Sequence, residues 1–351
     1  MDFTPTEEQT AVQELAGEIF ADLSTHERLT AARTGTDVEL WKALCGAGLP
    51  AAVEETGLLG LVLALEEQGR TTAQVPFAVS CVYGVLAVAA HGTREQRERL
   101  LPALRDGTAV ATGAFPARGE VRASAEEGPT AELTGVVPVV PWLREATHVL
   151  VPDASRALWW IRTGAPGVRT EPVETTAPWS AGRLTLSGAR GERVGGPGPG
   201  TYEDVLAAAR TAFAGLQSGV CAGSLHRAVE HTNTREQFGR PLATHQAVQL
   251  RAADAYMEIE AIRVTSYEAA WRRDEGLPYR THALTAAWWA SEAGRRVVHT
   301  GQHLHGGLGA DLEHPVHRHF LWGRQIDAYL GCGAELLEEL GGLIVEGEGV
   351  A

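Results

Sequence analysis

The sequence predicts a mostly α-helical protein with a small β domain in the middle of the chain. Three observations lead to this fold class. Helix-like runs come first, short runs of Val, Thr, Leu and Trp separated by Gly and Pro follow, and long helical patterns fill the rest. We therefore predict an N-terminal helical domain over residues 1–108, a middle β domain over residues 109–200 and a C-terminal four-helix bundle over residues 201–351.

Local patterns support the first two domains. Residues 75–90 are apolar on nearly all sides, which is typical of a helix buried within a helical domain. Residues 147–151 and 157–161 have the β-branched and aromatic composition of strands. The Gly and Pro cluster at residues 195–200 then predicts a loop and a domain boundary.

Four long helical patterns fill the third domain, and short connections between them favour antiparallel packing. An apolar stripe in the second pattern is expected to face the core or a subunit interface rather than a ligand. The stripe consists of Val248, Ala252, Ala255, Ile259 and Ile262. The four patterns cover residues 202–233, 245–275, 279–301 and 316–343.

The charge balance argues against several classes of partner. With 44 acidic and 30 basic residues, the formal net charge of -14 is unsuited to nucleic acid or an anionic membrane surface. There is no signal-peptide pattern at Met1 and no apolar run approaching the ~20 residues of a membrane helix, so we expect a cytoplasmic protein. The four cysteines are far apart, which predicts reduced thiols rather than disulfides or a zinc site.

Ten histidines from His226 onward invite a metal hypothesis, which we reject. Metal ligands must converge on one point, whereas His317 and His319 in the group with His314 are two residues apart and would point to different faces of a helix. We therefore predict no metal site.

One segment, residues 234–242, combines an arginine, an aromatic ring and a turn between two helical patterns. Arg235 offers a planar fork of donors suited to phosphate, and Phe238 offers a face for a flat ring system. Gly239, two residues before Pro241, is expected to close the preceding helix. The segment therefore predicts an anion site with a ring beside it.

A second segment, residues 303–309, contains Gly306 and Gly307, which let a backbone approach a ligand closely. Together the two segments resemble the C-terminal helical domain of the acyl-CoA dehydrogenase family, flavoproteins that remove two hydrogens from the Cα and Cβ of a fatty or steroidal acyl thioester. The resemblance is continuous over residues 202–344, extends to an N-terminal helical half that opens with residues 3–9, and is weakest in the middle of the chain.

The resemblance implies an FAD site that is shared across a subunit interface. Arg235 would face the FAD pyrophosphate, and the glycine pair would allow close approach of the same cofactor. The other positions that it implies are Gln237 and Phe238 along the cofactor, His245 and Gln246 at its adenosine half, His303 where the family usually has Gln, and His305 against the nucleotide.

The catalytic base of the family has no counterpart at the expected positions. Dehydrogenation requires a carboxylate that takes the α-proton while a hydride passes to the flavin. Counted without gaps, the two positions at which the family places this glutamate fall at Leu330 and near Ala209, and neither side chain accepts a proton. A shift in register would bring Glu335 into consideration.

The segments that hold the flavin ring in the family also differ here. Residues 114–120 and 141–144 lack the hydroxyl and amide donors of the family's Thr-Glu-Pro and Trp-Ile-Thr stretches, and residues 331–334 lack a further polar contact. A partner chain would have to supply the missing half of the site. Actinobacterial steroid degradation uses α2β2 heterotetramers of short, divergent chains of this family, and this sequence resembles the chain that lacks the base.

We therefore predict a subunit of a heteromeric FAD-dependent acyl-CoA dehydrogenase for a bulky acyl-CoA, such as that of a steroid with a shortened side chain. A second dehydrogenase-like subunit would carry the catalytic Glu, and an electron-transfer flavoprotein is the electron acceptor that the family resemblance implies.

Two alternatives stay open. One is a homodimeric enzyme of this fold that catalyses dehydration or cyclisation without flavin, favoured by an acid/base pair of Glu, Asp or His lining the cavity. The other is a flavin-free pseudoenzyme that serves assembly.

Overall fold

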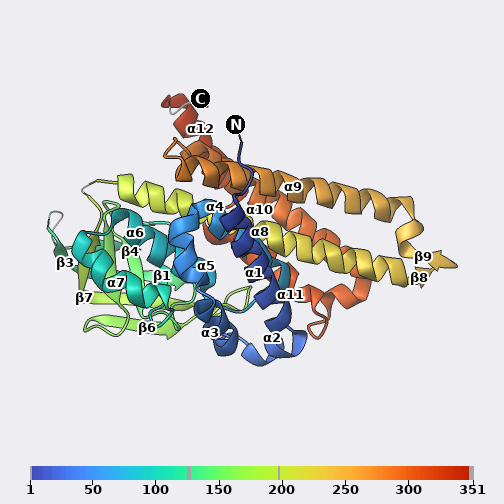
Figure 1. Ribbon diagram of the computed structural model, residues 1–351, viewed down its shortest axis with the longest axis horizontal. Coiled ribbons are helices and arrows are strands. Elements are labelled where there is room, and N and C mark those ends of the chain that lie inside the picture. The colour runs from blue at the N-terminus through green and yellow to red at the C-terminus, as the bar shows by residue number, and fades with distance from the viewer. Residues whose placement is uncertain (1, 125–127, 197, 348–351) are drawn as a thin grey trace. The chain divides into compact units, whose positions relative to one another are not determined.

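The computed structural model describes residues 2–124, 128–196 and 198–347. Helices dominate, and a seven-stranded sheet occupies the middle of the sequence, which confirms the predicted fold class (Figure 1). The first helices are α1 (Glu7–Leu23), α2 (His26–Ala32), α3 (Val38–Gly46), α4 (Leu49–Thr71), α5 (Phe77–Val79), the π-helix η1 (Ser80–Leu86), α6 (Ala87–His91) and α7 (Arg94–Arg105). The strands of the sheet are β1 (Ala111–Gly113), β2 (Val121–Ala123), β3 (Thr130–Val140), β4 (His148–Pro152), β5 (Leu158–Arg162), β6 (Val168–Pro172) and β7 (Gly182–Val194). The C-terminal elements are α8 (Gly200–Thr234), β8 (Glu236–Gln237), β9 (Arg240–Pro241), the 3-10 helix η2 (Leu242–Thr244), α9 (Gln246–Asp274), α10 (Arg280–His305), the 3-10 helix η3 (Gly306–Ala310), α11 (Val316–Tyr329) and α12 (Gly333–Val345).

Contacts within the chain define two compact units, which are described separately. The helical unit comprises Met1–His26, Val62–Ala73 and Arg210–Ala351, and the mixed unit comprises Glu27–Leu61 and Gln74–Ala209. The boundaries expected after residues 108 and 200 stay predictions. Pro197, in the breaker cluster, lies outside the described residues.

The mixed unit contains the helix and the strands that the sequence patterns predict. α5, η1 and α6 form one apolar helical run, almost fully buried. β4 and β5 pair antiparallel, with Val149 opposite Ile161 and Val151 opposite Trp159. These four side chains belong to the core of a sheet whose strand order is β1-β4-β5-β7-β3-β2, with β6 on β7. The buried Asp153 carboxylate accepts a hydrogen bond from Trp159 Nε1 at 2.8 Å.

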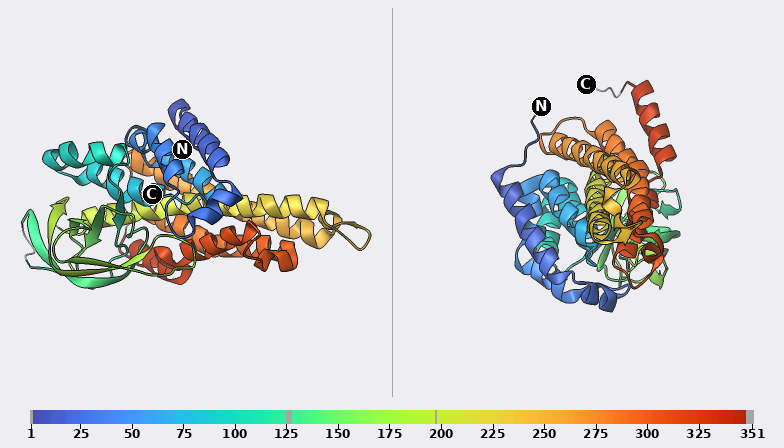
Figure 2. Two further views of the ribbon diagram at one scale, coloured as in Figure 1. Left: turned by 90° about the horizontal axis from the view of Figure 1, so that it is seen from below. Right: turned by 90° about the vertical axis from the view of Figure 1, so that its right-hand side faces the viewer.

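In the helical unit, α10 packs against α9, α11 and α12, and the long helices run side by side (Figure 2). The thiol of Cys221 on α8 donates to the carbonyl of Gly294 on α10 at 3.8 Å. α8 is long and apolar enough to cross a membrane, so the expectation that no apolar run approaches that length was wrong. Within α8, the apolar stretch of 18 residues is 94% buried inside the protein. Its apolar composition is therefore that of a core helix.

The fourth predicted helix of the bundle is in fact two helices. α11 ends at Tyr329 and α12 begins at Gly333, so the prediction of one helix over residues 316–343 was wrong. Gly331 has a φ of 119°, which a residue with a side chain rarely adopts, and it turns the chain between the helices. The apolar spacing continues across this turn, which explains why the periodic pattern concealed it.

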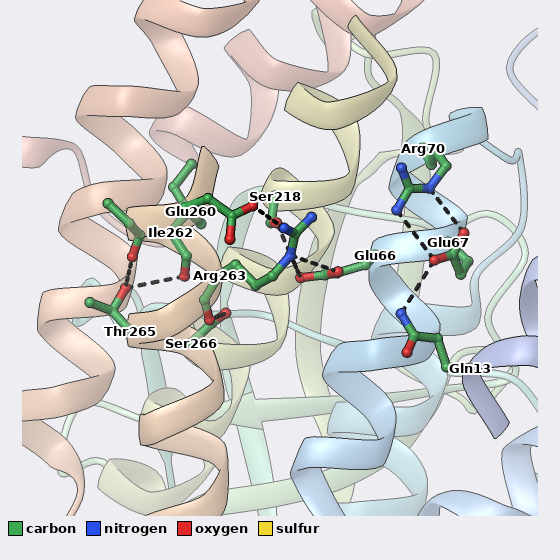
Figure 3. A network of polar contacts seen from close by, with 11 residues as sticks. Gln13, Glu66, Glu67, Arg70, Ser218, Glu260, Ile262, Arg263, Thr265 and Ser266 are labelled. Atoms are coloured by element: carbon green, nitrogen blue, oxygen red, sulfur yellow. Dashed lines mark hydrogen bonds and ion pairs between the residues drawn. The ribbon is translucent and has the colours of Figure 1, made fainter. Parts of the chain in front are cut away.

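A buried polar network joins three helices of the helical unit (Figure 3). Glu66 on α4 is 1% exposed. Its carboxylate accepts hydrogen bonds from Ser218 Oγ on α8 at 3.1 Å and from Arg263 Nε on α9 at 3.3 Å. Arg263 also pairs with Glu260. Burial raises the pKa of the Glu66 carboxyl, and Arg263 and Ser218 oppose that shift, so the carboxylate depends on these partners to stay charged.

Candidate functional site

The first candidate segment forms a β-hairpin, and not the helix end that Gly239 was expected to provide. α8 ends at Thr234, and β8 and β9 then pair across a two-residue turn. The turn residues Phe238 and Gly239 have φ angles of 57° and 76°. Positive φ at both positions is typical of the primed turns that match the twist of a tight hairpin.

Phe238 holds a strained backbone conformation while its side chain faces solvent. It is 90% exposed, and positive φ costs a bulky residue about 1–3 kcal/mol. Its ring meets the edge of the His245 ring, with 6.0 Å between centroids. Such strain concentrates at ligand and partner sites, and the exposed ring offers a face on which a flat ligand can stack.

Arg235 has a fixed backbone and an unpaired side chain. Both its N–H and its carbonyl are hydrogen-bonded within the hairpin region. Its exposed guanidinium makes no hydrogen bond or ion pair to any residue that the structure describes. Gln237 and Gln246 are exposed nearby in sequence, and His245 Nε2 is buried without a hydrogen-bond partner among the described residues. The exposed side chains of Arg235, Gln237 and Gln246 can bind a polar ligand, whereas His245 Nε2 is not accessible in this conformation.

The second candidate segment ends α10. Gly306 caps the helix with a φ of 62°, a conformation that favours glycine. A Cβ added at Gly306 or Gly307 would meet nothing within 4 Å, so the backbone of the pair faces open space. His303 is exposed, whereas His305 is 5% exposed. The turn therefore presents bare backbone that a ligand can approach.

The last turn of α8, which precedes the first candidate segment, contacts the second candidate segment, although about seventy residues separate them in sequence. The ring of His231, in the last turn of α8, stacks on the ring of His305 at the end of α10, with 4.7 Å between centroids and 19° between planes. His231 was not among the predicted site residues, because a single histidine on a helix gives no signal until its neighbour in space is known.

Leu330 lies where the chain turns between α11 and α12. It is 5% exposed and lines a pocket with room for about 20 Å³, roughly one water molecule. Arg210 lines the same pocket and donates two hydrogen bonds to the Glu339 carboxylate, at 2.8 and 2.7 Å. Ala209 is fully buried on α8. The Glu335 carboxylate accepts from Cys332 N–H at 3.2 Å and thereby caps α12.

In the mixed unit, aromatic packing occupies the segment that begins at Ala114. Phe115 stacks between Tyr83 and Tyr202, with centroid distances of 5.0 and 5.5 Å, and the N–H of Ala117 donates to the Tyr202 hydroxyl at 3.0 Å. The segment thus makes its contacts within the chain.

A separate open pocket of about 420 Å³ contains one acidic side chain and no histidine. Its lining is Thr34, Arg144, Pro172, Val173, Glu174, Thr175, Thr176, Ala177, Pro178 and Trp179.

One of the histidines that suggested a metal, His319, is a core residue. His319 is buried, and its Nε2 lies 3.0 Å from the Arg70 carbonyl. Burial lowers the pKa of His319 to about 3, so it is a neutral core residue. Among the described residues, no group of three or more His, Cys, Asp or Glu is placed to hold a metal ion, and the four cysteines are free thiols.

Comparison with known proteins identifies the protein family. Residues 6–108 match the family model for the acyl-CoA dehydrogenase N-terminal domain, and residues 198–339 match the model for the C-terminal domain. The chain belongs to the acyl-CoA dehydrogenase family, whose members are flavin-dependent oxidoreductases.

Individual relatives show which members of the family the chain resembles. The chain is 35% identical to acyl-CoA dehydrogenase FadE27 of Mycobacterium tuberculosis, over 99% of each chain. It is 42% identical to a chain of the Tcur3481-Tcur3483 steroid ACAD, with a TM-score of 0.91 over 97% of this chain and 99% of that one. It is 33% identical to a chain of the ChsE4-ChsE5 complex of Mycobacterium tuberculosis, with a TM-score of 0.92 over 99% of both.

Proposed function

We propose that this chain is one subunit of a heteromeric FAD-dependent acyl-CoA dehydrogenase, in which it completes the FAD site and a partner chain supplies the catalytic glutamate. The proposal rests on a difference between the two candidate parts of the site, the hairpin and the pocket at Leu330. The exposed polar side chains of Arg235, Gln237 and Gln246 lie at or directly after the hairpin, whereas the pocket at Leu330 is lined by no acid and has room for about one water molecule. Both solved relatives named above are complexes of two different chains.

The residues at the hairpin fit FAD. The unpaired Arg235 guanidinium suits a diphosphate, the exposed Phe238 ring suits a flat ring system, and Gly306 and Gly307 leave space for close approach. FAD, when bound, accepts the hydride that leaves the Cβ of the acyl-CoA. This chain's contribution is binding and orientation, because neither Leu330 nor Ala209 can remove the α-proton.

An exposed apolar stripe on α9 supports association with the partner. Leu250, Met257 and Val264 recur every seven residues on one face and are 57%, 62% and 48% exposed. Residues seven apart lie on the same side of a helix, and apolar surface of this kind marks contact with another protein.

The proposed substrate is a bulky acyl-CoA, steroidal as in the relative at 42% identity. The proposal places the enzyme in the cytoplasm, with an electron-transfer flavoprotein as acceptor.

The test is to express this chain alone and with the short dehydrogenase-like chain encoded beside it. We expect yellow, FAD-bound heterotetramer from co-expression only, measured by absorbance and native mass. A homodimer of this chain with stoichiometric FAD would contradict the shared site. A colourless complex would favour the assembly pseudoenzyme. The non-redox homodimer has less support, since neither pocket is lined by a pair of Glu, Asp or His.

Replacing Leu330 by glutamate is not expected to restore a base. The new carboxylate would enter the pocket that Arg210 lines, and a guanidinium nearby lowers the pKa of a carboxyl and makes it a poor proton acceptor. We expect the Leu330→Glu complex to keep its turnover within about twofold and to gain no second active site, while burial of the carboxylate lowers the free energy of unfolding by roughly 1–3 kcal/mol. Active-site titration, which counts the flavins reduced per tetramer, would disprove this expectation if the count rose.

A further inference from the structure

One pocket of the mixed unit takes no part in the proposed function. It is the open pocket of about 420 Å³ described above, a volume within the range of about 300–1,000 Å³ that is usual for small-molecule sites. Thr34 comes from the loop between α2 and α3, and Arg144 comes from the loop between β3 and β4. The other lining residues, 172–179, form the end of β6 and the loop before β7. We call this site the Arg144 pocket.

The loops around the Arg144 pocket are held by contacts within the mixed unit. Trp142, in the β3–β4 loop, has a φ of 55°, and its carbonyl accepts hydrogen bonds from the N–H groups of Glu145 and Ala146 at 3.1 Å each. The side chain of the fully buried Gln74 donates to the Pro178 carbonyl in the loop before β7. Positive φ at a bulky residue persists only where surrounding contacts enforce it, and such positions concentrate at ligand sites. The wall of the pocket is therefore formed before a ligand binds.

The Arg144 pocket is lined by one cation and one anion that are not paired with each other. One nitrogen of the Arg144 guanidinium donates to Thr34, at 3.1 Å to Oγ1 and at 3.4 Å to the carbonyl oxygen, and the other two nitrogens bond to no described residue. The Glu174 carboxylate makes no hydrogen bond or ion pair to any residue that the structure describes. Glu145, next to Arg144, accepts from Ser180 Oγ at 3.0 Å instead. A ligand can therefore meet an available guanidinium and an available carboxylate in the same pocket.

The uncharged lining adds an apolar wall and a hydroxyl acceptor. Pro172, Val173 and Trp179 supply the apolar wall. Thr175 Oγ1 donates its hydrogen to the Ala177 carbonyl at 2.8 Å, so its lone pairs remain to accept from a ligand. A ligand with a single charge would leave either the guanidinium or the carboxylate of the pocket unpaired. A zwitterion with an apolar body matches all of these groups.

We propose that the Arg144 pocket binds an α-amino acid with an apolar side chain, whose carboxylate pairs with Arg144 and whose ammonium pairs with Glu174. The Arg235 hairpin, the glycine pair and the pocket at Leu330 take no part, so this inference goes beyond the proposed function and does not depend on it. Because the pocket is open and the ligand is small, the dissociation constant is expected in the millimolar range.

The test is calorimetric titration of the full chain, alone and co-expressed with its partner, with L-phenylalanine. N-acetylphenylalanine lacks the ammonium group and phenylalaninamide lacks the carboxylate, and each should bind about tenfold more weakly than phenylalanine. Alanine keeps both charges but lacks the apolar ring, and it should also bind more weakly.

Two variants assign each charge of the ligand to one residue. Glu174→Gln should weaken phenylalanine binding about tenfold and leave the binding of N-acetylphenylalanine unchanged. Arg144→Gln should weaken phenylalanine binding about tenfold and leave that of phenylalaninamide unchanged. Both side chains are exposed, so neither substitution is expected to disturb the fold. Glu171→Gln, at an exposed position of β6 outside the pocket lining, is the matched control and should change no affinity.

Equal affinities for phenylalanine and its two charge-blocked analogues, unchanged affinities in both variants, or absence of binding in both samples would each overturn the inference. Displacement of phenylalanine by FAD or CoA would also overturn it, because the pocket would then belong to the dehydrogenase site. Charge-dependent binding of phenylalanine by a complex that holds no flavin would support the inference even though the proposed function had failed.

Discussion

Replacing Arg235 by glutamine is expected to weaken FAD binding by the heteromeric complex roughly 10- to 100-fold, because a hydrogen bond to a charged group contributes about 1.5–3 kcal/mol and about 1.4 kcal/mol is a factor of ten. The guanidinium has no ion pair among the described residues, so the substitution removes no internal contact. The effect should therefore appear in the Kd for FAD, measured by flavin fluorescence on apo complex, and not in stability.

Two further variants separate charge from geometry. Arg235→Lys keeps the charge but loses the planar fork, so its Kd should lie between those of the native complex and Arg235→Gln. Arg251→Gln removes another exposed arginine, from α9, and should leave the Kd unchanged. An unchanged Kd in Arg235→Gln, with FAD still bound at full stoichiometry, would show that the hairpin does not contact the cofactor.

The sequence predicted those features that depend on local patterns. The apolar run over residues 75–90 and the strands β4 and β5 follow from composition and periodicity over a few residues. The site segments could be found in the sequence for a similar reason. Arg235, Phe238 and the glycine pair each have a chemical property that does not depend on contact with another segment. Whether they bind FAD as the resemblance implies stays a prediction.

Other features depend on contacts between distant segments or on backbone dihedrals. Gly239 serves equally well in a helix cap or a hairpin turn, and the pairing of β8 with β9 decides between them. The turn at Gly331 was concealed by apolar spacing that runs through it. The ring of His305 on α10 contacts the rings of His231 on α8 and His314 in the loop before α11, and no spacing in the sequence relates the three residues.

The second large effect is expected on stability, from Gly219→Ala on α8. Inside a helix this change normally gains about 1 kcal/mol from propensity. Here the added Cβ would lie 2.0 Å from the carbonyl oxygen of Glu66 and 2.8 Å from its Cα, so it meets helix backbone that cannot rotate away. α4 and α8 would have to separate, which disturbs the Glu66 hydrogen bond to Ser218. We expect a net loss of about 3 kcal/mol in the free energy of unfolding, near the upper end for overpacking.

Gly341→Ala is the matched control, because Gly341 lies within α12 and an added Cβ there would meet nothing within 4 Å. That variant should gain about 0.5–1 kcal/mol, so the same chemical change is expected to have opposite signs at the two positions. Urea unfolding followed by far-UV circular dichroism measures both. A stabilised Gly219→Ala protein would mean that α4 and α8 are further apart than the close crossing at Glu66 requires. A destabilised one would confirm that α8 and α4 cross too closely at Glu66 for a side chain on Gly219.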